Sequence, residues 1–224
     1  MIIEEGFMKR SIRLICVSVL IMTAAFGLYS TQQDLKQKLR DRDRDRWMWQ
    51  LPRQVMDKIG VQPGMVVADV GAGDGYFSVY LAKRVGKTGK VFANDIDEKA
   101  LGILKERCQW EKIKNITIIK GKPDDPLLPE AAVDLALLVN VIQQIENPSV
   151  FFDNLKKSLK PGGIIVFIQW DADKMVAEHP GLDSDFRVEF SQQNTLMMID
   201  KVGLNIISTE TFLPVQNIYI CKLR

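Results

Sequence analysis

The sequence has little of what disulfide-rich, metal-binding or nucleic-acid-binding proteins need. Its three cysteines, Cys16, Cys108 and Cys221, are too few and too scattered for a disulfide framework, and no two have metal-ligand spacing. The single histidine, His179, excludes a site built from several histidines. With 30 basic and 28 acidic residues the net charge is +2, so there is no general basic field for nucleic acid. We therefore expect no metal site and no nucleic-acid partner.

What remains has the composition of a globular protein, with 46% apolar and 26% charged residues. The charge is uneven along the chain. Residues 1–46 hold nine basic and six acidic side chains, a net of +3, whereas residues 47–224 carry a net of −1. We interpret residues 1–30 as a signal peptide or membrane anchor, residues 31–46 as a charged linker, and residues 47–224 as one near-neutral domain.

The membrane-directed interpretation rests on residues 14–29, LICVSVLIMTAAFGLY, which contain no charge and follow Lys9, Arg10 and Arg13. A buried core helix is the alternative. Six basic residues follow the run and three precede it, so an uncleaved segment would keep the domain in the cytoplasm. A cleaved signal peptide, for which residues 25–27 (Ala-Phe-Gly) offer a weak site, would export it.

In the domain, short apolar runs alternate with stretches of helical periodicity. Strands are predicted at 65–70, 91–93, 116–119, 133–141, 164–170, 205–212 and 217–223, and helices at 76–85, 99–110, 148–159 and 192–202, with a short helix ending at Gly60. A turn is predicted at 160–163 and a polar excursion at 171–190. This alternation predicts an α/β fold with a mainly parallel, doubly wound sheet, and the last two strands should form a hairpin.

A glycine loop follows the first predicted strand, in the segment Asp-Val-Gly-Ala-Gly-Asp-Gly-Tyr at residues 69–76. Glycines there permit a sharp turn and the close approach of a ligand. The spacing is G-x-G-x-G, because Tyr76 occupies the third dinucleotide-glycine position. Asp69 and Asp74 disfavour a pyrophosphate and suit an ammonium or sulfonium group. Twenty residues after Gly75, Asp95 ends the second strand, where a carboxylate can accept both hydroxyls of a ribose. A purely structural turn is the alternative.

These motifs resemble the class I S-adenosylmethionine-dependent methyltransferases. The acid before the loop matches Asp69, the loop matches Gly71, Gly73 and Gly75, and the ribose acid matches Asp95. The segments VDLALLVNVIQQIENP and LKPGGIIVFIQW resemble that family's fourth strand and its later turn. The resemblance covers roughly residues 50–224 and implies a Rossmann-like seven-stranded sheet of order 3-2-1-4-5-7-6 with an antiparallel last strand. It implies S-adenosylmethionine as cofactor and a small-molecule methyl acceptor.

The resemblance also assigns site residues. It implies that the loop, with Gly71, Ala72, Gly73 and Gly75, lies against the methionine part of the cofactor. Asp95 would meet the ribose and Ile96 the adenine. Relatives often have Gly-Asp where this chain has Gly121-Lys122, and lysine cannot accept a hydrogen bond from the adenine amino group. We expect Asp124, or its neighbour Asp125, to substitute, with a solvated turn as the alternative.

The end of the fourth strand supplies the last predicted ligand, Asn140, because ligands bind at the carboxyl ends of such strands. Relatives have a His-His pair after this strand, and this chain has Gln143-Gln144, which cannot act as a general base. The two glutamines can orient a substrate or lie on a helix surface.

No catalytic residue is assigned. His179, Asp171 and Asp173 are equally weak candidates for a base, and Trp170 can shape a substrate pocket or cap the sheet. The sequence thus favours a methyltransferase. A methyltransferase-like binding module without catalysis is the alternative, and a nicotinamide-dependent oxidoreductase is a distant third.

Overall fold

The protein is described from a computed structural model, which covers residue 30, residues 32–178 and residues 184–224. The chain divides into two compact units, residues 1–45 and residues 46–224. In the first unit, residue 30 and residues 32–45 are helical. Within the part of the chain that is described, no helix combines the length and the apolar composition needed to cross a membrane. The predicted segment 14–29 lies outside the described residues.

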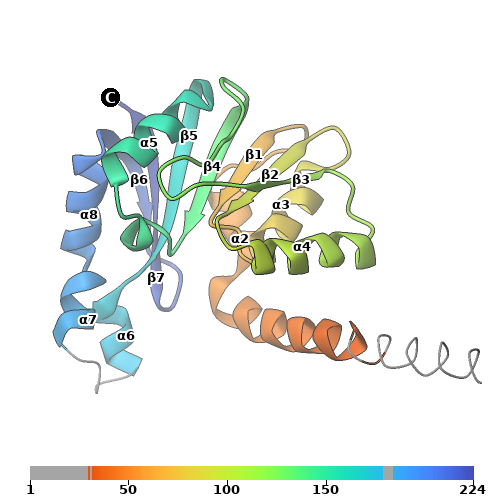
Figure 1. The fold of residues 1–224 in the computed structure, drawn as a ribbon. Coiled ribbons are helices and arrows are strands. Elements are labelled where there is room, and N and C mark those ends of the chain that lie inside the picture. The colour runs from red at the N-terminus through yellow and green to blue at the C-terminus, as the bar shows by residue number, and fades with distance from the viewer. Residues whose placement is uncertain (1–29, 31, 179–183) are drawn as a thin grey trace, which may run out of the picture. The chain divides into compact units, whose positions relative to one another are not determined.

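The second unit is built on one seven-stranded sheet of order β3-β2-β1-β4-β5-β7-β6 (Figure 1). The strands are β1 (Val66–Val70), β2 (Lys90–Asp95), β3 (Ile116–Lys120), β4 (Val133–Val139), β5 (Leu159–Trp170), β6 (Leu204–Glu210) and β7 (Gln216–Leu223). Strands β1 to β5 pair in parallel, whereas β7 is antiparallel to both β5 and β6. This confirms the predicted fold class, sheet order and antiparallel last strand.

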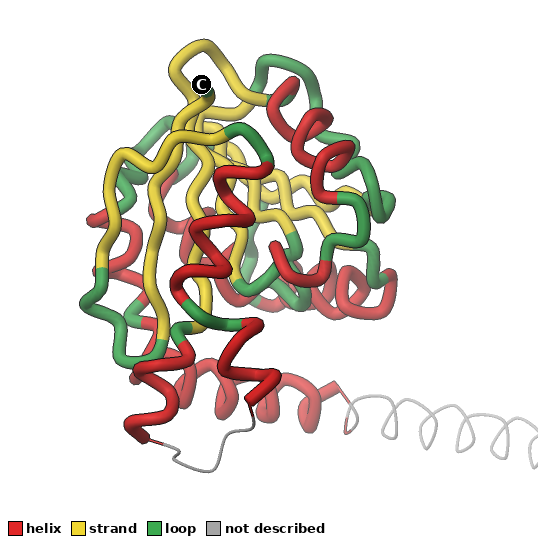
Figure 2. The backbone as a smooth tube through the Cα atoms, turned by 90° about the vertical axis from the view of Figure 1, so that its left-hand side faces the viewer, coloured by secondary structure: helices red, strands yellow, loops and turns green. Residues whose placement is uncertain are grey.

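Helices cover both faces of the sheet, as the continuous apolar strands require (Figure 2). One face packs against α2 (Pro52–Lys58), α3 (Tyr76–Val85) and α4 (Glu98–Trp110). The other packs against α5 (Pro148–Lys157) and α8 (Gln192–Lys201). Successive strand residues alternate between these two layers. In β5, for example, Val166 and Ile168 face the first layer, and Ile165 and Phe167 face the second. Both layers are therefore core, which leaves the carboxyl ends of the parallel strands for the site.

Several predicted boundaries differ from the structure, and the start of the fifth strand differs most. Residues 160–163, predicted as a turn, belong to β5, which begins at Leu159. Val133 pairs with Leu159 but Leu135 pairs with Ile164, so the extra residues form an irregularity within the strand. The fourth strand ends at Val139. The short 3₁₀ helix η1 (Ile142–Gln144) follows it.

The polar excursion after β5 is helical over most of its described part. It forms α6 (Ala172–Glu178) and α7 (Ser184–Glu189). Asp171 starts α6 by accepting hydrogen bonds from the backbone N–H groups of Asp173 (3.0 Å) and Lys174 (3.3 Å). The Lys174 ammonium then donates to three backbone carbonyls around the β6–β7 turn, those of Thr211, Leu213 and Gln216. The excursion is therefore fastened to the terminal hairpin.

Candidate functional site

The glycine loop crosses from β1 to α3 and is pinned to the neighbouring strand. The backbone N–H groups of Gly71 and Ala72 both donate to the carbonyl of Asn94 in β2, at 2.8 and 2.9 Å. The Gly75 N–H donates to the Ala72 carbonyl at 2.9 Å. The loop thus has a fixed conformation at the carboxyl ends of β1 and β2.

Two of its glycines have different reasons for lacking a side chain. Gly71 has a φ of 74°, and a Cβ there would overlap the side chain of Val141. Gly73 has a φ of 56°, and a Cβ there would meet nothing within 4 Å. Gly71 therefore permits close packing against the segment after β4, whereas Gly73 leaves open space beside its backbone that a ligand can occupy.

Asp95, the predicted ribose acid, is tied directly to this loop. Its Oδ2 accepts a hydrogen bond from the Gly73 N–H at 2.7 Å, and its Oδ1 accepts one from the Asp97 N–H at 2.9 Å. A carboxylate has about four lone-pair sites. Each oxygen can therefore still accept a hydroxyl, which is what a ribose requires.

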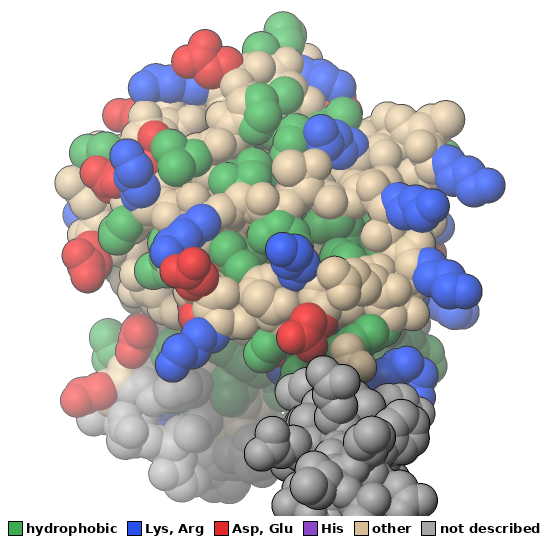
Figure 3. Space-filling view, turned by 45° about the vertical axis from the view of Figure 1, so that its right-hand side comes forward, with side chains coloured by type: hydrophobic (Ala, Val, Ile, Leu, Met, Phe, Trp, Pro, Cys, Tyr) green, Lys and Arg blue, Asp and Glu red, His purple; other side chains and the backbone are tan. Residues whose placement is uncertain are grey.

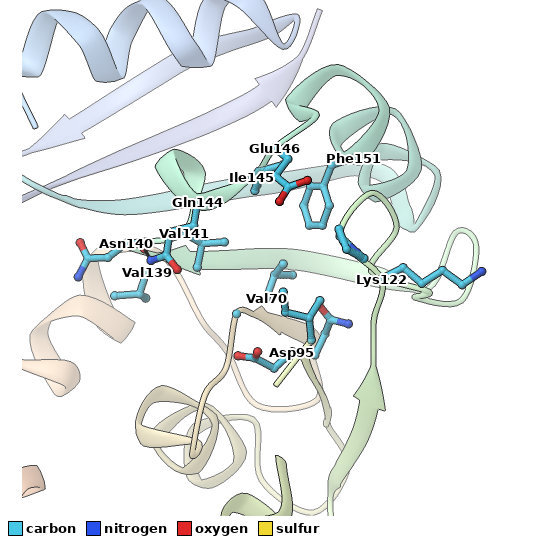
Figure 4. A pocket seen from close by; sticks show the side chains of 14 residues that line it. Val70, Asp95, Lys122, Val139, Asn140, Val141, Gln144, Ile145, Glu146 and Phe151 are labelled. Atoms are coloured by element: carbon cyan, nitrogen blue, oxygen red, sulfur yellow. Dashed lines mark hydrogen bonds between the residues drawn. The ribbon is translucent and has the colours of Figure 1, made fainter. Parts of the chain in front are cut away.

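A cavity of about 230 Å³ opens at the carboxyl ends of β1, β2 and β4. Its lining is mainly apolar and comes from residues 70–71, 94–96, 122–123, 139–141, 144–146 and Phe151. In Figure 4, Val70 and Asp95 lie on one side, and Glu146 and Phe151 lie side by side on the other. The volume is below the ~300–1,000 Å³ of pockets for drug-sized ligands. It suits the adenosine part of the cofactor, and the open space beside Gly73 leaves room for the methionine part.

Asp69 lies behind the loop and is 2% exposed. Its Oδ2 accepts a hydrogen bond from the Ser78 hydroxyl at 2.5 Å. Burial raises the pKa of Asp69 from 3.8 to about 6, although the Ser78 hydrogen bond and the positive charge of Arg46 act in the opposite direction. A cation at the loop would favour the charged form of this carboxyl group.

Three other predicted site residues, Ile96, Ala72 and Asp124, differ in their relation to the cavity. Ile96 is 57% exposed and lines the cavity. Ala72 packs with Leu101 and Leu104 beneath α4, so it offers the site its backbone only. Asp124 is exposed and is not among the lining residues; its carbonyl accepts a hydrogen bond from Asn154.

Asn140 is at the cavity wall, but its side chain is used elsewhere. Its Oδ1 accepts hydrogen bonds from the Trp170 N–H (3.2 Å) and from Gln216 Nε2 (3.0 Å). Its φ of 55° is left-handed. The Asn140 carbonyl accepts a hydrogen bond from Gln144 Nε2 at 2.7 Å. In Figure 4 its amide points away from Asp95 and Phe151, so it shapes the wall through the backbone.

The two glutamines of η1 differ. Gln144 is exposed and lines the cavity. The amide nitrogen and oxygen of Gln143 are both buried without a hydrogen-bond partner among the described residues. A helix-surface position therefore describes Gln144 and not Gln143.

Glu146 and Phe151 are among the lining residues that sequence reasoning missed. Glu146 lies in the segment after η1 and Phe151 lies in α5, and neither was predicted as a site residue. Lys122 also lines the cavity, with its ammonium pointing away from the other labelled side chains (Figure 4). Glu146 is thus a second lining carboxylate besides Asp95. Its place after a strand that carries ligands was the available signal.

The candidate bases have mainly structural surroundings. Asp171 is 7% exposed, starts α6 and accepts a hydrogen bond from Asn217 Nδ2 at 2.6 Å. Asp173 is exposed. Trp170 stacks on Trp49 with ring centroids 5.1 Å apart and an interplanar angle of 24°. His179 lies outside the described residues.

On the face shown in Figure 3, acidic and basic side chains are scattered between apolar and uncharged groups. A second hollow of about 640 Å³ lies between α4 and β3, with Leu101, Cys108 and Ile118 among its lining residues. It receives none of the predicted site residues.

The sequence is similar to those of known methyltransferases. Residues 68–167 match the family described as a methyltransferase domain. The ubiquinone/menaquinone biosynthesis C-methyltransferase of Hydrogenovibrio crunogenus is 29% identical over 119 residues, covering 53% of this chain and 47% of that protein. The demethylmenaquinone methyltransferase of Oceanobacillus iheyensis is 26% identical over 143 residues, covering 64% and 58%. The chain thus spans about half the length of the curated relatives that it matches.

Solved structures share the fold. An S-adenosylmethionine-dependent methyltransferase from Aquifex aeolicus superposes with a TM-score of 0.71 at 24% identity, covering 83% of this chain and 96% of that one. The geranyl diphosphate C-methyltransferase of Streptomyces coelicolor A3(2) superposes with a TM-score of 0.60 at 13% identity, covering 78% of each chain. This sheet order, this glycine loop and the methyltransferase-domain match over residues 68–167 make the chain similar to the class I S-adenosylmethionine-dependent methyltransferases.

Proposed function

We propose that this protein binds S-adenosylmethionine and transfers its methyl group to a small-molecule acceptor. The observation that carries the proposal is the joining of Asp95 to the glycine loop through the Gly73 N–H, at the mouth of a cavity of nucleoside size. When bound, the cofactor supplies an electrophilic methyl group on a sulfonium. The chain's own residues bind and orient it: Asp95 at the ribose, and Ile96 and Phe151 at the base.

The remaining site residues would set the cofactor's position. Gly71 and Ala72 hold the loop against β2, and Gly73 leaves space for the ligand. Asp69, behind the loop, supplies negative potential for the sulfonium and ammonium groups. Methyl transfer then requires an acceptor atom held in line with the methyl group, which is a matter of positioning.

For the acceptor we propose a quinol-type ring that is methylated on carbon. Two relatives carry names that refer to menaquinone or demethylmenaquinone, and one of them is named a C-methyltransferase. Next to the strand ends, the stacked pair Trp49–Trp170 offers a flat aromatic surface that suits such a ring. Reduced 1,4-naphthoquinone is a simple acceptor with which to test this step.

Binding calorimetry of the full chain with S-adenosylmethionine and S-adenosylhomocysteine tests the proposal. We expect micromolar Kd values, and we expect Asp95→Ala to weaken binding at least tenfold because the ribose hydrogen bonds are lost. Asp153→Ala is the matched control, since Asp153 lies on α5 with an exposed side chain paired to Lys156. Binding of neither compound by the wild-type protein would refute the proposal.

The rival function is a methyltransferase-like binding module. It makes a different prediction, namely micromolar binding of S-adenosylhomocysteine without methyl transfer to any of a broad panel of acceptors. Transfer of a radiolabelled methyl group to reduced 1,4-naphthoquinone, or to another member of the panel, would exclude this alternative.

We also propose that residues 14–29 attach the protein to a membrane with the domain on the cytoplasmic side, where the cofactor is made available. The support is the uncharged run and the six basic residues that follow it. A reporter enzyme fused to the carboxyl terminus tests the orientation. Activity of a periplasm-specific or secreted reporter would refute the cytoplasmic placement.

A further inference from the structure

One cationic side chain is held at the glycine-loop end of the site, and it comes from the segment that the sequence assigned to a charged linker. Arg46 is the first residue of the second unit. Its guanidinium lies 4.0 Å from the centroid of the Tyr76 ring, and Tyr76 is the first residue of α3, directly after the loop. Its charge is close enough to Asp69 to lower the pKa of that buried carboxyl group. Arg46 therefore lies close to both flanks of the glycine loop, Asp69 before it and Tyr76 after it.

The position of Arg46 is fixed by a chain of hydrogen bonds. Its Nε donates to Gln50 Oε1 at 2.8 Å. Gln50, which is completely buried, donates to Gln216 Oε1 at 3.3 Å. Gln216 in turn donates to Asn140 Oδ1 at 3.0 Å. The guanidinium is thus connected through buried amides to the wall of the cavity, which limits its freedom to swing into solvent.

The loop backbone is poorly equipped to receive an anion. Four of its N–H groups already donate to acceptors inside the protein: those of Gly71, Ala72, Gly73 and Gly75. The carboxylates around it, Asp69, Asp74 and Asp95, would repel a negative group. A ligand that carries both an ammonium and a carboxylate can place its ammonium against these acidic side chains. Its carboxylate needs a donor from elsewhere.

Two cationic side chains, Lys122 and Arg46, have different surroundings. Lys122 lines the cavity on the far side of Asp95, in the turn after β3, next to the apolar groups that suit the base. Arg46 is not among the lining residues and lies over the ring of Tyr76, the residue that follows the loop. Because a guanidinium presents several donors in one plane, it matches a carboxylate in a bidentate manner.

We propose that Arg46 is a cofactor-binding residue that holds the α-carboxylate of the methionine end of S-adenosylmethionine. This inference rests on the proposed function. It means that the first residue of the second unit contributes to the cofactor site.

The test compares two ligands that differ in the group concerned. S-Adenosylhomocysteine carries the amino-acid end, whereas 5′-methylthioadenosine lacks it. For Arg46→Gln we expect the Kd of S-adenosylhomocysteine, measured by calorimetry, to rise about tenfold to a hundredfold, because a charge-assisted hydrogen-bonded pair is lost. The Kd of 5′-methylthioadenosine should change less than twofold. Arg46→Lys, which keeps the charge, should restore part of the affinity.

Arg53→Gln is the matched control, because Arg53 is an exposed arginine on α2. It should leave both affinities unchanged. Thermal unfolding of each variant shows that the fold is retained. An unchanged Kd for S-adenosylhomocysteine in Arg46→Gln, or an equal loss for both ligands, would overturn the assignment while leaving the proposed function standing. Failure of the wild-type protein to bind either ligand would overturn both.

Discussion

The buried carboxyl group of Asp69 should make the ligand-free protein less stable as the pH rises through the weakly acidic range. Its pKa is 3.8 in the unfolded chain and about 6 in the folded one, mainly because burial disfavours the charged form. Between these values the folded state binds more protons than the unfolded state, so the free energy of unfolding falls as the pH rises from about 4 to about 6. Stability from the neutral carboxyl is fully present below pH 4.

The size of the effect follows from the shift. Each pKa unit corresponds to about 1.4 kcal/mol. A pKa shift of about two units therefore lowers the free energy of unfolding by about 3 kcal/mol between pH 4 and pH 7. Asp69→Asn removes the titration and keeps an amide oxygen as acceptor for the Ser78 hydroxyl. We expect this variant to be more stable than the wild-type protein at pH 7 by about 1–3 kcal/mol.

The assay is urea unfolding of ligand-free protein, followed by tryptophan fluorescence at several pH values from 4.5 to 7.5. The difference between wild type and Asp69→Asn should grow with pH and level off above about 6. Asp153→Asn, an exposed carboxylate on α5, serves as the control and should show no such growth. A difference independent of pH would refute the reasoning. Because Asp69, behind the glycine loop, would supply negative potential for the cofactor's sulfonium and ammonium groups, the same substitution should also weaken binding of S-adenosylmethionine.

Two further predictions concern the loop and the excursion after β5. Gly71→Ala should lower the melting temperature and abolish S-adenosylhomocysteine binding, because its Cβ overlaps Val141. Gly73→Ala should lower the free energy of unfolding by only about 1–2 kcal/mol because of its left-handed φ, and it should still weaken binding because its Cβ enters the ligand's space. Calorimetry and thermal unfolding of both variants check this, and equal behaviour of the two would contradict it. Lys174→Met should lower the free energy of unfolding by about 1–3 kcal/mol, because three backbone carbonyls lose their hydrogen-bond donor, and it should change S-adenosylhomocysteine affinity little. Urea unfolding measures the change, and unchanged stability would contradict the role of Lys174 in attaching α6 to the hairpin.

Much of the fold could be predicted because the strands are buried on both faces. Continuous apolar runs flanked by glycine turns give clear boundaries, and α3 begins and ends at the predicted residues, Tyr76 and Val85. The start of β5 could not be predicted from the local pattern. Pro161 and Gly162 have turn chemistry, but the pairing of Leu159 with Val133 across the neighbouring strand extends β5 through them. Such long-range pairing overrides local propensity.

The site was predictable where backbone chemistry decides it. Gly71, Gly73 and Asp95 could be named because a turn, a ligand approach and a strand end each require a particular residue type. Side-chain direction could not be predicted. Asn140 ends the correct strand, yet its amide is taken by Trp170 and Gln216 from strands distant in the sequence.

Arg46 could not be recognised as a site residue from the local sequence either. In the sequence it is one of several arginines alternating with aspartates, and nothing local separates it from Arg44. Its contacts with Gln50 and with the Tyr76 ring, thirty residues later, mark it as part of the domain. Residues brought to a site by packing leave no periodic signal in the sequence.

A crystal structure of the full chain with S-adenosylhomocysteine tests the central claim most directly. The account predicts the adenine between Ile96 and Phe151, the ribose hydroxyls within hydrogen-bond distance of the Asp95 carboxylate, and the homocysteine end over Gly73. A ligand bound elsewhere, or a ribose without contact to Asp95, would contradict it.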